Sequence, residues 1–420
     1  MRVAIVGSGI SGLTAARELH REHEITLFES EPRLGGHAHT VTVEDAGVSQ
    51  HLDTGFLVFN RRDYPRFEAI LDELGVGSKP SDMSFSVRCS RTGVEYNGSS
   101  PGSIFCQPAN AIRPGFWRML RDVFRFYRDG RATVAGMSED ATVDDLVRAA
   151  RYSEEFVSWH LLPLGSALWS APPSAFRHYP VHFVVDFFDR HDLLELNIRR
   201  RVGWRTVANG SASYVERLAD AFRDRIRLGD PVRSIRRTSD GVRVLTTGGE
   251  ATVDEVILAC HGDDALSLLE DPTPAEREIL GAVRYQTNEV VLHTDTSLLP
   301  RTRKAWASWN YHVRPDRDLA TVTYDLNRLQ GLRSTTRYCV TLNETESVDP
   351  SRIIRRFSYS HPQYSLDWVR LRKQRDRIQG VHKAWFCGAY FGNGFHEDGV
   401  RSAAEVVDAI AHRALVARAS

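Results

Sequence analysis

The sequence predicts an α/β protein: a parallel sheet with helices on it, joined to a second region of helices and antiparallel strands. Three observations support this fold class. A strand, a glycine-rich turn, a helix and a second strand follow one another within the first thirty residues. Val256–Ala259 is a run of four apolar residues, as expected of a strand covered on both faces. Between these two regions, apolar and aromatic residues recur at helical spacing.

The amino-terminal unit begins with a short apolar strand at Arg2–Val6. The motif GSGISG follows at residues 7–12, and the pattern predicts a helix over Leu13–His20. A second strand is expected at Glu24–Glu29. This spacing is typical of a β-α-β unit that binds a dinucleotide.

Each glycine of this motif has its own physical reason. Gly7 permits a tight turn, Gly9 lets a pyrophosphate approach the backbone, and Gly12 lets the helix pack closely on the strand. The helix N-terminus supplies N–H groups and a favourable dipole for phosphate. Glu29 ends the second strand, where a carboxylate can accept hydrogen bonds from ribose hydroxyls.

Further along the chain, a hairpin is expected around Val41–Val43, and a helix over residues 67–74 ends at Gly75. From about residue 78 to 200 the β-α-β alternation stops and helices are expected to dominate. These expected helices are Phe116–Tyr127, Val143–Ala150, Phe156–Trp169 and Val181–Leu194.

Strand patterns return at about residue 226. Gly248-Gly249 predicts a hairpin between its flanking strands. Strands are expected at Ile226–Leu228, Val232–Arg236, Val242–Thr246 and Ala251–Cys260, and an antiparallel sheet at Glu289–Thr294, Lys304–Tyr311, Leu319–Tyr324 and Arg337–Leu342. A short strand at Ala384–Cys387, a glycine-rich loop at residues 388–399 and a helix at Val400–Leu415 follow.

Composition excludes several classes of protein. The chain has 420 residues with 54 Lys+Arg and 54 Asp+Glu, so it lacks the basic excess of a general nucleic-acid binder. Five widely spaced cysteines without a CxxC pair disfavour a disulfide scaffold and a zinc site. No apolar run reaches the roughly 18 residues of a membrane span. We therefore expect a cytoplasmic protein.

Four motifs extend the nucleotide-binding pattern. They are E-x3-R-x-G-G at residues 29–36, D-x-G at 53–55, V-x-x-I with VDEVILA at 232–259, and FCG…G-x4-G-V-x-S-A at 386–403. Together they resemble the flavin-dependent amine oxidase and phytoene desaturase superfamily. The resemblance implies a Rossmann-type domain that binds FAD non-covalently.

The resemblance also implies roles for individual residues. Arg33 and the following glycine pair line the FAD pyrophosphate and ribityl chain, and His37 stands where an arginine or lysine is usual. Residues 53–55 lie near the flavin ring, and Val232 holds the adenine through its backbone. The helix that begins near Gly399 points its N-terminus at the flavin pyrimidine, where it stabilises negative charge on reduction.

Five further segments are GHAHT at residues 36–40, DTGFLVFN at 53–60, PSDMSFS at 80–86, NRLQ at 327–330 and GAYFGNGFHEDG at 388–399. Through them the chain more closely resembles, nearly end to end, a bacterial subgroup labelled only as predicted NAD/FAD-binding proteins, to which a furan-fatty-acid desaturase is similar. Members of this subgroup occur beside enzymes that resemble cyclopropane-fatty-acid synthases. The resemblance therefore implies a lipid acyl substrate and a lipid-modifying enzyme as a partner.

The candidate site residues form two groups. His396 and Glu397 are candidate proton acceptors or substrate-orienting residues; alternatively they and Asp398 order the loop and cap the following helix. The predicted FAD-binding residues are Gly7, Gly9, Ile10, Ser11, Gly12, Glu29, Ser30, Arg33, Gly35, Gly36, His37, Thr54, Gly55, Phe56, Val232, Gly388, Asp398, Gly399 and Val400.

Other residues allow two interpretations. His37 and His39 form an HxH pair, but no third ligand is evident nearby, so no metal site is expected. Lys304 is either a solvated strand residue or a lysine that holds a water near the flavin. Several aromatic residues are expected in the protein core, with some forming the wall of an apolar pocket: Trp159, His160, Trp169, Phe183, Phe187, Trp306, Trp309 and Tyr311.

The FAD-binding domain is expected to comprise residues 1–77, 200–267 and 378–420, and the substrate domain residues 78–199 and 268–377. The leading hypothesis is an FAD-dependent oxidoreductase, of the desaturase or oxidase type, that abstracts hydride from an apolar, acyl-type substrate. An amine oxidase, a flavin-dependent double-bond isomerase and an FAD-binding accessory subunit of a lipid-modifying complex are the alternatives.

Overall fold

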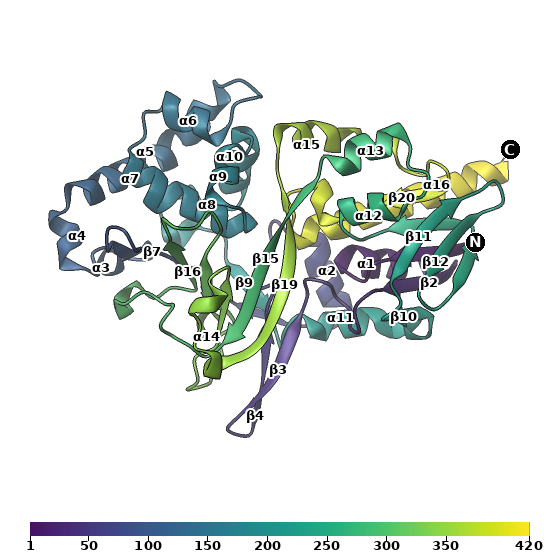
Figure 1. Ribbon diagram of the computed structural model, residues 1–420, viewed down its shortest axis with the longest axis horizontal. Helices are drawn as coiled ribbons and strands as arrows, with labels where there is room; N and C mark the ends of the chain where they lie inside the picture. Colours follow the sequence, from purple (N-terminus) through teal and green to yellow (C-terminus); the bar gives the residue numbers. More distant parts are fainter. Residues whose placement is uncertain (420) are drawn as a thin grey trace.

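A five-stranded parallel sheet forms the centre of one half of the molecule, in a computed structural model that describes residues 1–419 (Figure 1). The strand order is β10-β2-β1-β14-β20, and all neighbouring strands are parallel. The predicted α/β class is therefore confirmed. The strands are β1 (Arg2–Val6), β2 (Glu24–Glu29), β10 (Ile226–Leu228), β14 (Glu255–Leu258) and β20 (Ala384–Phe386).

Each face of this sheet packs against a different layer. Ala4 and Val6 share a core with an antiparallel three-stranded meander, whereas Val3 and Ile5 share a core with four helices. This alternation follows from the period of two in a strand. The meander contains β11 (Val232–Arg237), β12 (Val242–Thr246) and β13 (Glu250–Val253), and the helices are α1 (Ile10–Leu19), α2 (Pro65–Glu73), α11 (Ala212–Ala219) and α16 (His396–Ala419).

The other half contains a seven-stranded sheet in the order β19-β15-β18-β17-β16-β7-β8. All its pairs are antiparallel except β16 with β7. The four strands expected to form an antiparallel sheet correspond to β15, β16, β17 and β18 and do pair antiparallel, whereas the added strand β7 pairs with β16 in parallel and makes the whole sheet mixed. Its strands are β7 (Phe85–Cys89), β8 (Glu95–Asn97), β15 (Arg284–His293), β16 (Trp309–Val313), β17 (Val322–Asp325), β18 (Cys339–Leu342) and β19 (Ile353–Gln363).

A helical layer lies beside this sheet, at the left of Figure 1. The four long helical patterns in the sequence each form helix here. The layer contains α3 (Pro101–Ile104), α4 (Pro108–Ile112), α5 (Pro114–Ala135), α6 (Val143–Ala149), α7 (Glu154–Phe156), the π-helix η1 (Val157–Leu161), α8 (Leu162–Trp169), α9 (Pro173–Arg177) and α10 (Val181–Arg190).

Smaller elements connect the two halves. The expected hairpin is β3 (Thr40–Asp45) with β4 (Val48–Asp53), and a small sheet joins β5 (Phe59–Asn60), β9 (Trp204–Val207) and β6 (Ser78–Pro80). The remaining helices are α12 (Gly262–Leu268), α13 (Pro274–Gly281), α14 (Leu326–Leu329) and α15 (Leu366–Leu371). Short 3-10 turns are η2 (Ile198–Arg200), η3 (Asp220–Arg225), η4 (Arg303–Ala305), η5 (Thr345–Ser347), η6 (Pro350–Arg352), η7 (Arg372–Arg377) and η8 (Ala389–Phe391).

Three local expectations are corrected. Lys304 lies in the 3-10 turn η4 and not in a strand, because the strand begins only at Trp309. The expected strand Ala251–Cys260 is divided at Asp254 into β13 and β14. Helix α16 begins at His396, four residues earlier than expected, so His396, Glu397 and Asp398 form its first turn.

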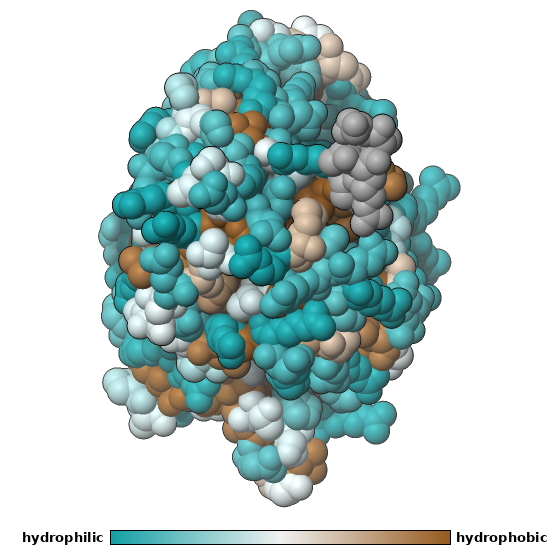
Figure 2. Space-filling view, turned by 90° about the vertical axis from the view of Figure 1, so that its right-hand side faces the viewer, coloured by the Kyte–Doolittle hydropathy of each residue, from teal (hydrophilic) through white to brown (hydrophobic). Residues whose placement is uncertain are grey.

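None of the helices in residues 1–419 combines the length and hydropathy needed to cross a bilayer. Figure 2 shows the molecule from the right-hand end of Figure 1. Hydrophilic side chains dominate this face, and hydrophobic ones are scattered over it.

Candidate cofactor and active site

The turn between β1 and α1 has the geometry that its glycines predict. Gly7 adopts a φ of +102°, which favours glycine. A Cβ on Gly12 would overlap the carbonyl oxygen of Gly7 and would lie 3.3 Å from the Cβ of Ala259. A Cβ on Gly9, in contrast, would meet no described atom within 4 Å. Gly12 is therefore needed for packing, and Gly9 borders open space.

The N-terminus of α1 faces that space without a cap. No side chain in residues 1–419 caps this helix, and its first turn contains no acidic residue. Ile10 and Ser11 are nevertheless buried, with 8% and 4% of their surface exposed. Buried N–H groups at a helix start need an acceptor, and a pyrophosphate is an anion of the right kind. The site therefore fits a dinucleotide.

The second glycine pair lies directly beside the first motif. The Gly35 N–H donates to the Ser8 carbonyl oxygen at 3.0 Å, and a Cβ on Gly36 would lie 3.4 Å from the Gly9 Cα. Arg33 Nη1 donates to the Gly36 carbonyl oxygen at 2.8 Å and thereby closes the turn. The two motifs, separated by some twenty residues in sequence, thus form one surface.

Glu29 connects the end of β2 to the glycine turn. Its Oε2 accepts hydrogen bonds from the N–H and Oγ of Ser8, at 2.8 and 2.6 Å, and its Oε1 accepts from the Glu31 N–H and the Ser30 Oγ. The start of β11 lies close by, because the Asp230 N–H donates to the Glu29 carbonyl oxygen at 3.1 Å. Val232 is therefore brought near the predicted ribose-binding carboxylate.

Residues 54–56 run alongside residues 37–39. The Thr54 N–H donates to the His39 carbonyl oxygen, and the Phe56 N–H to the His37 carbonyl oxygen, both at 2.9 Å. A Cβ on Gly55 would overlap the His37 carbonyl oxygen, so this close approach requires glycine.

The N-terminus of α16 meets that of α1. A Cβ on Gly399 would lie 2.8 Å from Ile10 Cγ2 and 2.9 Å from Ser11 Oγ. Asp398 Oδ2 accepts from the N–H groups of Asn393 and Phe395, at 2.8 and 3.2 Å. Asp398 therefore orders the glycine-rich loop that leads into this helix, while Gly388 and Val400 lie at its two ends. Two helix N-termini converge on one region.

Comparison with known proteins is decisive here. The profile of the flavin containing amine oxidoreductase family matches residues 10–411. The chain belongs to this family. Membership makes the protein an FAD-dependent oxidoreductase of this family, and the uncapped helix start and open space at Gly9 are compatible with the cofactor that the family implies.

Two kinds of relative illustrate the similarity. The Mycobacterium tuberculosis protein AofH, named as a flavin-containing monoamine oxidase, is 27% identical over 286 residues, which cover 64% of this chain. The alignment spans only 59% of the length of AofH.

Solved structures share the fold over nearly the whole chain. Wild-type putrescine oxidase bound to putrescine gives a TM-score of 0.70 at 14% identity, covering 98% of this chain and 99% of that one. The fatty acid isomerase from P. acnes that produces CLA gives 0.68 at 16% identity, covering 97% and 98%. Amine-bound and fatty-acid-converting proteins thus have this same fold.

His396 is enclosed by aromatic side chains. Its ring stacks on Phe56 with centroids 3.4 Å apart, and a hydrogen bond of 2.8 Å joins its Nε2 to the Tyr214 hydroxyl. Burial lowers the pKa of His396 to about 3. The imidazole is therefore neutral near pH 7 and held in a fixed orientation.

Glu397 contacts a different element. Its two carboxylate oxygens accept hydrogen bonds from the backbone N–H groups of Arg66 and Phe67, at 3.2 and 3.0 Å. These groups belong to the first turn of α2, where a carboxylate stabilises the helix dipole. Burial raises the pKa of Glu397. Its role as a proton acceptor stays a prediction.

Three histidines from separate segments gather beside the glycine pair. The ring of His37 lies 5.7 Å from that of His261, 5.3 Å from that of His361 and 5.1 Å from that of Tyr359, measured between centroids. Within the described chain, His37 Nε2 is buried without a hydrogen-bond partner. Burial, together with the neighbouring histidines, lowers the pKa of His37 well below its ordinary value.

Sequence reasoning missed two of these three histidines. His261 follows β14 at the carboxyl end of a parallel strand, which is the edge where ligands bind in α/β sheets. That rule could have found it. His361 lies on β19, a strand that was not predicted. Side-chain ligand atoms of His261, Asp263 and Asp264 lie within 4.8 Å of one another, but both carboxylates are exposed at the start of α12.

The predicted aromatic residues divide into two groups. Trp169, Phe183 and Phe187 pack together beside the 388–399 loop, and the Trp169 indole N–H donates to the Asn393 carbonyl oxygen at 3.2 Å. The others lie elsewhere: Trp159 and His160 in η1, Trp306 after η4, and Trp309 and Tyr311 on β16.

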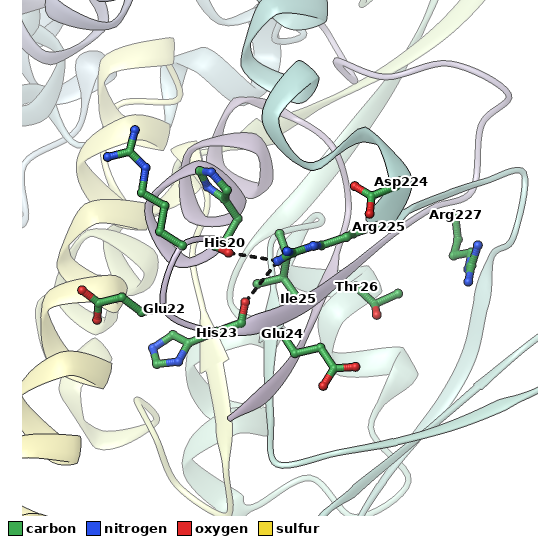
Figure 3. Close-up of a pocket in the computed structure, with 10 residues that line it drawn as sticks. His20, Glu22, His23, Glu24, Ile25, Thr26, Asp224, Arg225 and Arg227 are labelled. Atoms are coloured by element: carbon green, nitrogen blue, oxygen red, sulfur yellow. Dashed lines mark hydrogen bonds between the residues drawn. The ribbon is translucent and has the colours of Figure 1, made fainter.

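A surface hollow of about 450 Å³ lies at the opposite end of the parallel sheet (Figure 3). It is lined by the end of α1, the start of β2 and the segment 224–227. Arg225 Nη1 donates to the carbonyl oxygens of His20 and His23, which closes the C-terminal end of α1. Because ligands bind at the carboxyl ends of parallel strands, this hollow is separate from the cofactor site.

Acid is expected to destabilise the protein through its buried histidines. Burial lowers the pKa of four histidines to about 4 and that of His396 to about 3, against roughly 6.5 when unfolded; the four are His39, His160, His293 and His361. The stability these groups contribute is fully present above pH 6.5 and is lost as pH falls towards 4. Burial raises the pKa of Asp53 to about 6. Protonation of this carboxyl in the folded protein adds stability as the pH falls from about 6 to 4, which offsets the loss from one histidine.

We therefore expect the unfolding free energy to be about 5 kcal/mol lower at pH 5.5 than at pH 7, since each of the five histidines contributes about 1.4 kcal/mol per pH unit below its unfolded pKa and Asp53 offsets part of the sum. Urea titrations at the two pH values measure this difference. His361→Gln should reduce it, whereas the same change at exposed His412 should not. Equal stability at both pH values would contradict the expectation.

Proposed function

We propose that this protein oxidises or desaturates an apolar substrate that carries a carboxylate, such as a fatty-acyl chain. FAD, when bound, supplies the acceptor for a hydride equivalent from a substrate C–H bond. The observation that carries the proposal is Arg372, a cation without a carboxylate partner beside an aromatic cluster.

The aromatic cluster consists of Trp169, Phe183, Phe187, Tyr364 and Phe395. Ring centroids lie 4.7 Å apart for Phe183 and Tyr364 and 4.9 Å apart for Phe187 and Phe395. The Tyr364 hydroxyl is buried without a hydrogen-bond partner in the described chain. A set of rings with one unused hydroxyl is suited to an apolar chain and not to a charged one.

Arg372 adds one positive charge to this cluster. Its guanidinium lies 5.2 Å from the Phe183 ring centroid, and its Nη1 donates to the Gly392 carbonyl oxygen at 2.5 Å. No ion pair within residues 1–419 involves Arg372. Its other guanidinium N–H groups can bind a substrate carboxylate, whereas an ammonium group would be repelled.

The carboxylates nearest the loop are already occupied. Glu397 accepts from the start of α2, and Asp398 accepts from Asn393, Phe395 and Arg401. An amine substrate would therefore find little negative charge here, which favours the acyl class over the amine class.

The proposal assigns the remaining roles as follows. Backbone groups at residues 7–12, 33–36, 54–56 and 398–400 hold and orient FAD, with Glu29 on the ribose and Val232 on the adenine. His396 fixes the neighbouring ring of Phe56, and Glu397 is the candidate that holds a proton on a carboxylate oxygen. The domain division at residues 1–77, 200–267 and 378–420 is part of the same proposal.

The test is anaerobic bleaching of the purified flavoprotein, because it needs no second electron acceptor. Long-chain unsaturated fatty acids should bleach the visible flavin absorbance, and putrescine or cyclohexylamine should not. Arg372→Met should weaken the response to the acid about tenfold or more, since a charge-assisted hydrogen bond contributes about 1.5–3 kcal/mol, and should leave the response to the methyl ester unchanged.

Arg370→Met is the matched control, because Arg370 is exposed and pairs with Asp140. Bleaching by amines alone would overturn the acyl proposal in favour of an amine oxidase, the activity named for AofH. A shifted double bond without net bleaching would indicate an isomerase. Flavin that stays oxidised with every substrate until a lipid-modifying partner is added would indicate an accessory subunit.

A further inference from the structure

The outer face of α5 carries large apolar side chains in water. Trp117 is 52% exposed and Phe124 is 57% exposed, and they are the exposed large aromatic side chains of the described chain. Seven residues separate them, so they lie two turns apart on one face. Ile112, at the end of α4, is 84% exposed and follows Ala111, whose carbonyl oxygen accepts a hydrogen bond of 2.8 Å from the Trp117 indole N–H.

Arginines alternate with Trp117 and Phe124 along the outer face of α5. Arg121 and Arg128 follow Trp117 and Phe124 by four residues each, and Arg131 comes one turn later. Their side chains are 60%, 72% and 77% exposed. These six residues, Ile112, Trp117, Arg121, Phe124, Arg128 and Arg131, form what we call the basic-aromatic face.

Helix α5 and the side chains that pair with it carry a net positive charge. Residues 113–135 contain six arginines and two aspartates. Neighbouring elements add Glu155, which pairs with Arg118, and Asp189, which pairs with Arg131. A surplus of two positive charges remains, although the whole chain is neutral. Because exposed ion pairs contribute little, the arginines can exchange them for phosphate.

The inner face of α5 packs in the protein core, so the exposed rings on the outer face are not needed to hold the helix in place. Phe116, Met119 and Phe126 are fully buried in the core, so the helix is already anchored without its exposed rings. In Figure 1, α5 lies in the helical layer on the left side of the molecule, whereas the right-hand end presents the mainly hydrophilic surface of Figure 2. The exposed aromatic anchors are therefore confined to one end.

We propose that the basic-aromatic face docks the enzyme on an anionic phospholipid bilayer. Tryptophan and phenylalanine insert at the boundary between headgroups and acyl chains, while arginines bind the phosphates. Aliphatic Ile112 has no flat ring to stack on a nucleic-acid base, which favours a bilayer over a nucleic acid. The proposal is independent of the substrate, but it would place the enzyme where acyl chains are available.

The experiment is flotation of the FAD-loaded protein with vesicles of phosphatidylcholine alone or mixed with phosphatidylglycerol. We expect binding to the mixed vesicles that weakens at high salt, since screening shortens electrostatic range. Trp117→Ser with Phe124→Ser should lower binding about tenfold or more. Arg121→Gln, Arg128→Gln and Arg131→Gln together should abolish the preference for phosphatidylglycerol.

The matched control is Leu228→Ser with Leu245→Ser, which removes two exposed apolar side chains at the other end of the molecule. It should bind vesicles like the unchanged protein. Equal binding by all variants, or equal binding to both vesicle types, would overturn the proposal. Binding to DNA or RNA instead of vesicles would also overturn it, as would a dimer that these substitutions split without affecting vesicle binding. FAD absorbance of each variant verifies folding independently of activity.

Discussion

Gly9→Ala is expected to yield a folded protein that has lost most of its FAD, whereas Gly12→Ala is expected not to fold stably. The backbone at Gly9, with φ −63° and ψ 177°, suits alanine, and the new Cβ would enter the open space at the start of α1. The Cβ at Gly12 would overlap a backbone carbonyl, and such overpacking costs about 3 kcal/mol or more.

FAD content after purification measures the first effect, as the ratio of visible to ultraviolet absorbance. We expect a drop of about tenfold or more for Gly9→Ala, because a methyl group that blocks a phosphate contact removes at least one charge-assisted hydrogen bond. Gly102→Ala, where a Cβ also meets nothing within 4 Å, is the control. Full FAD content in Gly9→Ala would contradict the assignment of the phosphate site.

Arg237→Met is expected to destabilise the protein by about 3–5 kcal/mol, because it leaves a buried carboxylate without its partner. Arg237 on β11 and Glu276 on α13 form a two-pronged ion pair of 2.6 and 3.0 Å, with side chains only 2% and 0% exposed. Replacing both residues with methionine should recover much of the loss, because no isolated charge then remains.

Urea unfolding of the two single variants and the double variant measures the coupling energy directly. The neighbouring pair of Arg236 and Glu270 is the control, since its side chains are 62% and 34% exposed. Arg236→Met should cost less than about 1 kcal/mol. Similar losses for Arg236→Met and Arg237→Met would show that burial is not what makes the inner pair important.

The parallel sheet could be predicted because its strands carry local signals, such as the apolar run in β14 and the glycines after β1. β19 was missed because its sequence contains Arg355, Arg356 and Pro362, which weaken a strand pattern. It tolerates them because it is the edge strand, paired only with β15. Whether a strand is central or at the edge depends on topology, which a local window does not contain.

In the candidate site, too, some features could be predicted from local sequence and others could not. The backbone cradle follows from the spacing of glycines. The contacts of Glu397 with Arg66 and Phe67, more than three hundred residues away, do not. The histidine cluster likewise unites His37, His261 and His361 from three distant segments. Such groupings arise only once the chain is folded, because no local pattern links their members.

The order of the sheet also has a consequence for synthesis. β1 is made first, but its neighbour β14 follows some 250 residues later, and α16, which meets α1 at the cofactor site, begins roughly 390 residues after β1. At about 5–20 residues per second, a ribosome needs roughly 20–80 s to supply the missing helix. The nucleotide cradle is thus completed only when its last segment emerges, and FAD would then fasten together the earliest and latest parts of the chain.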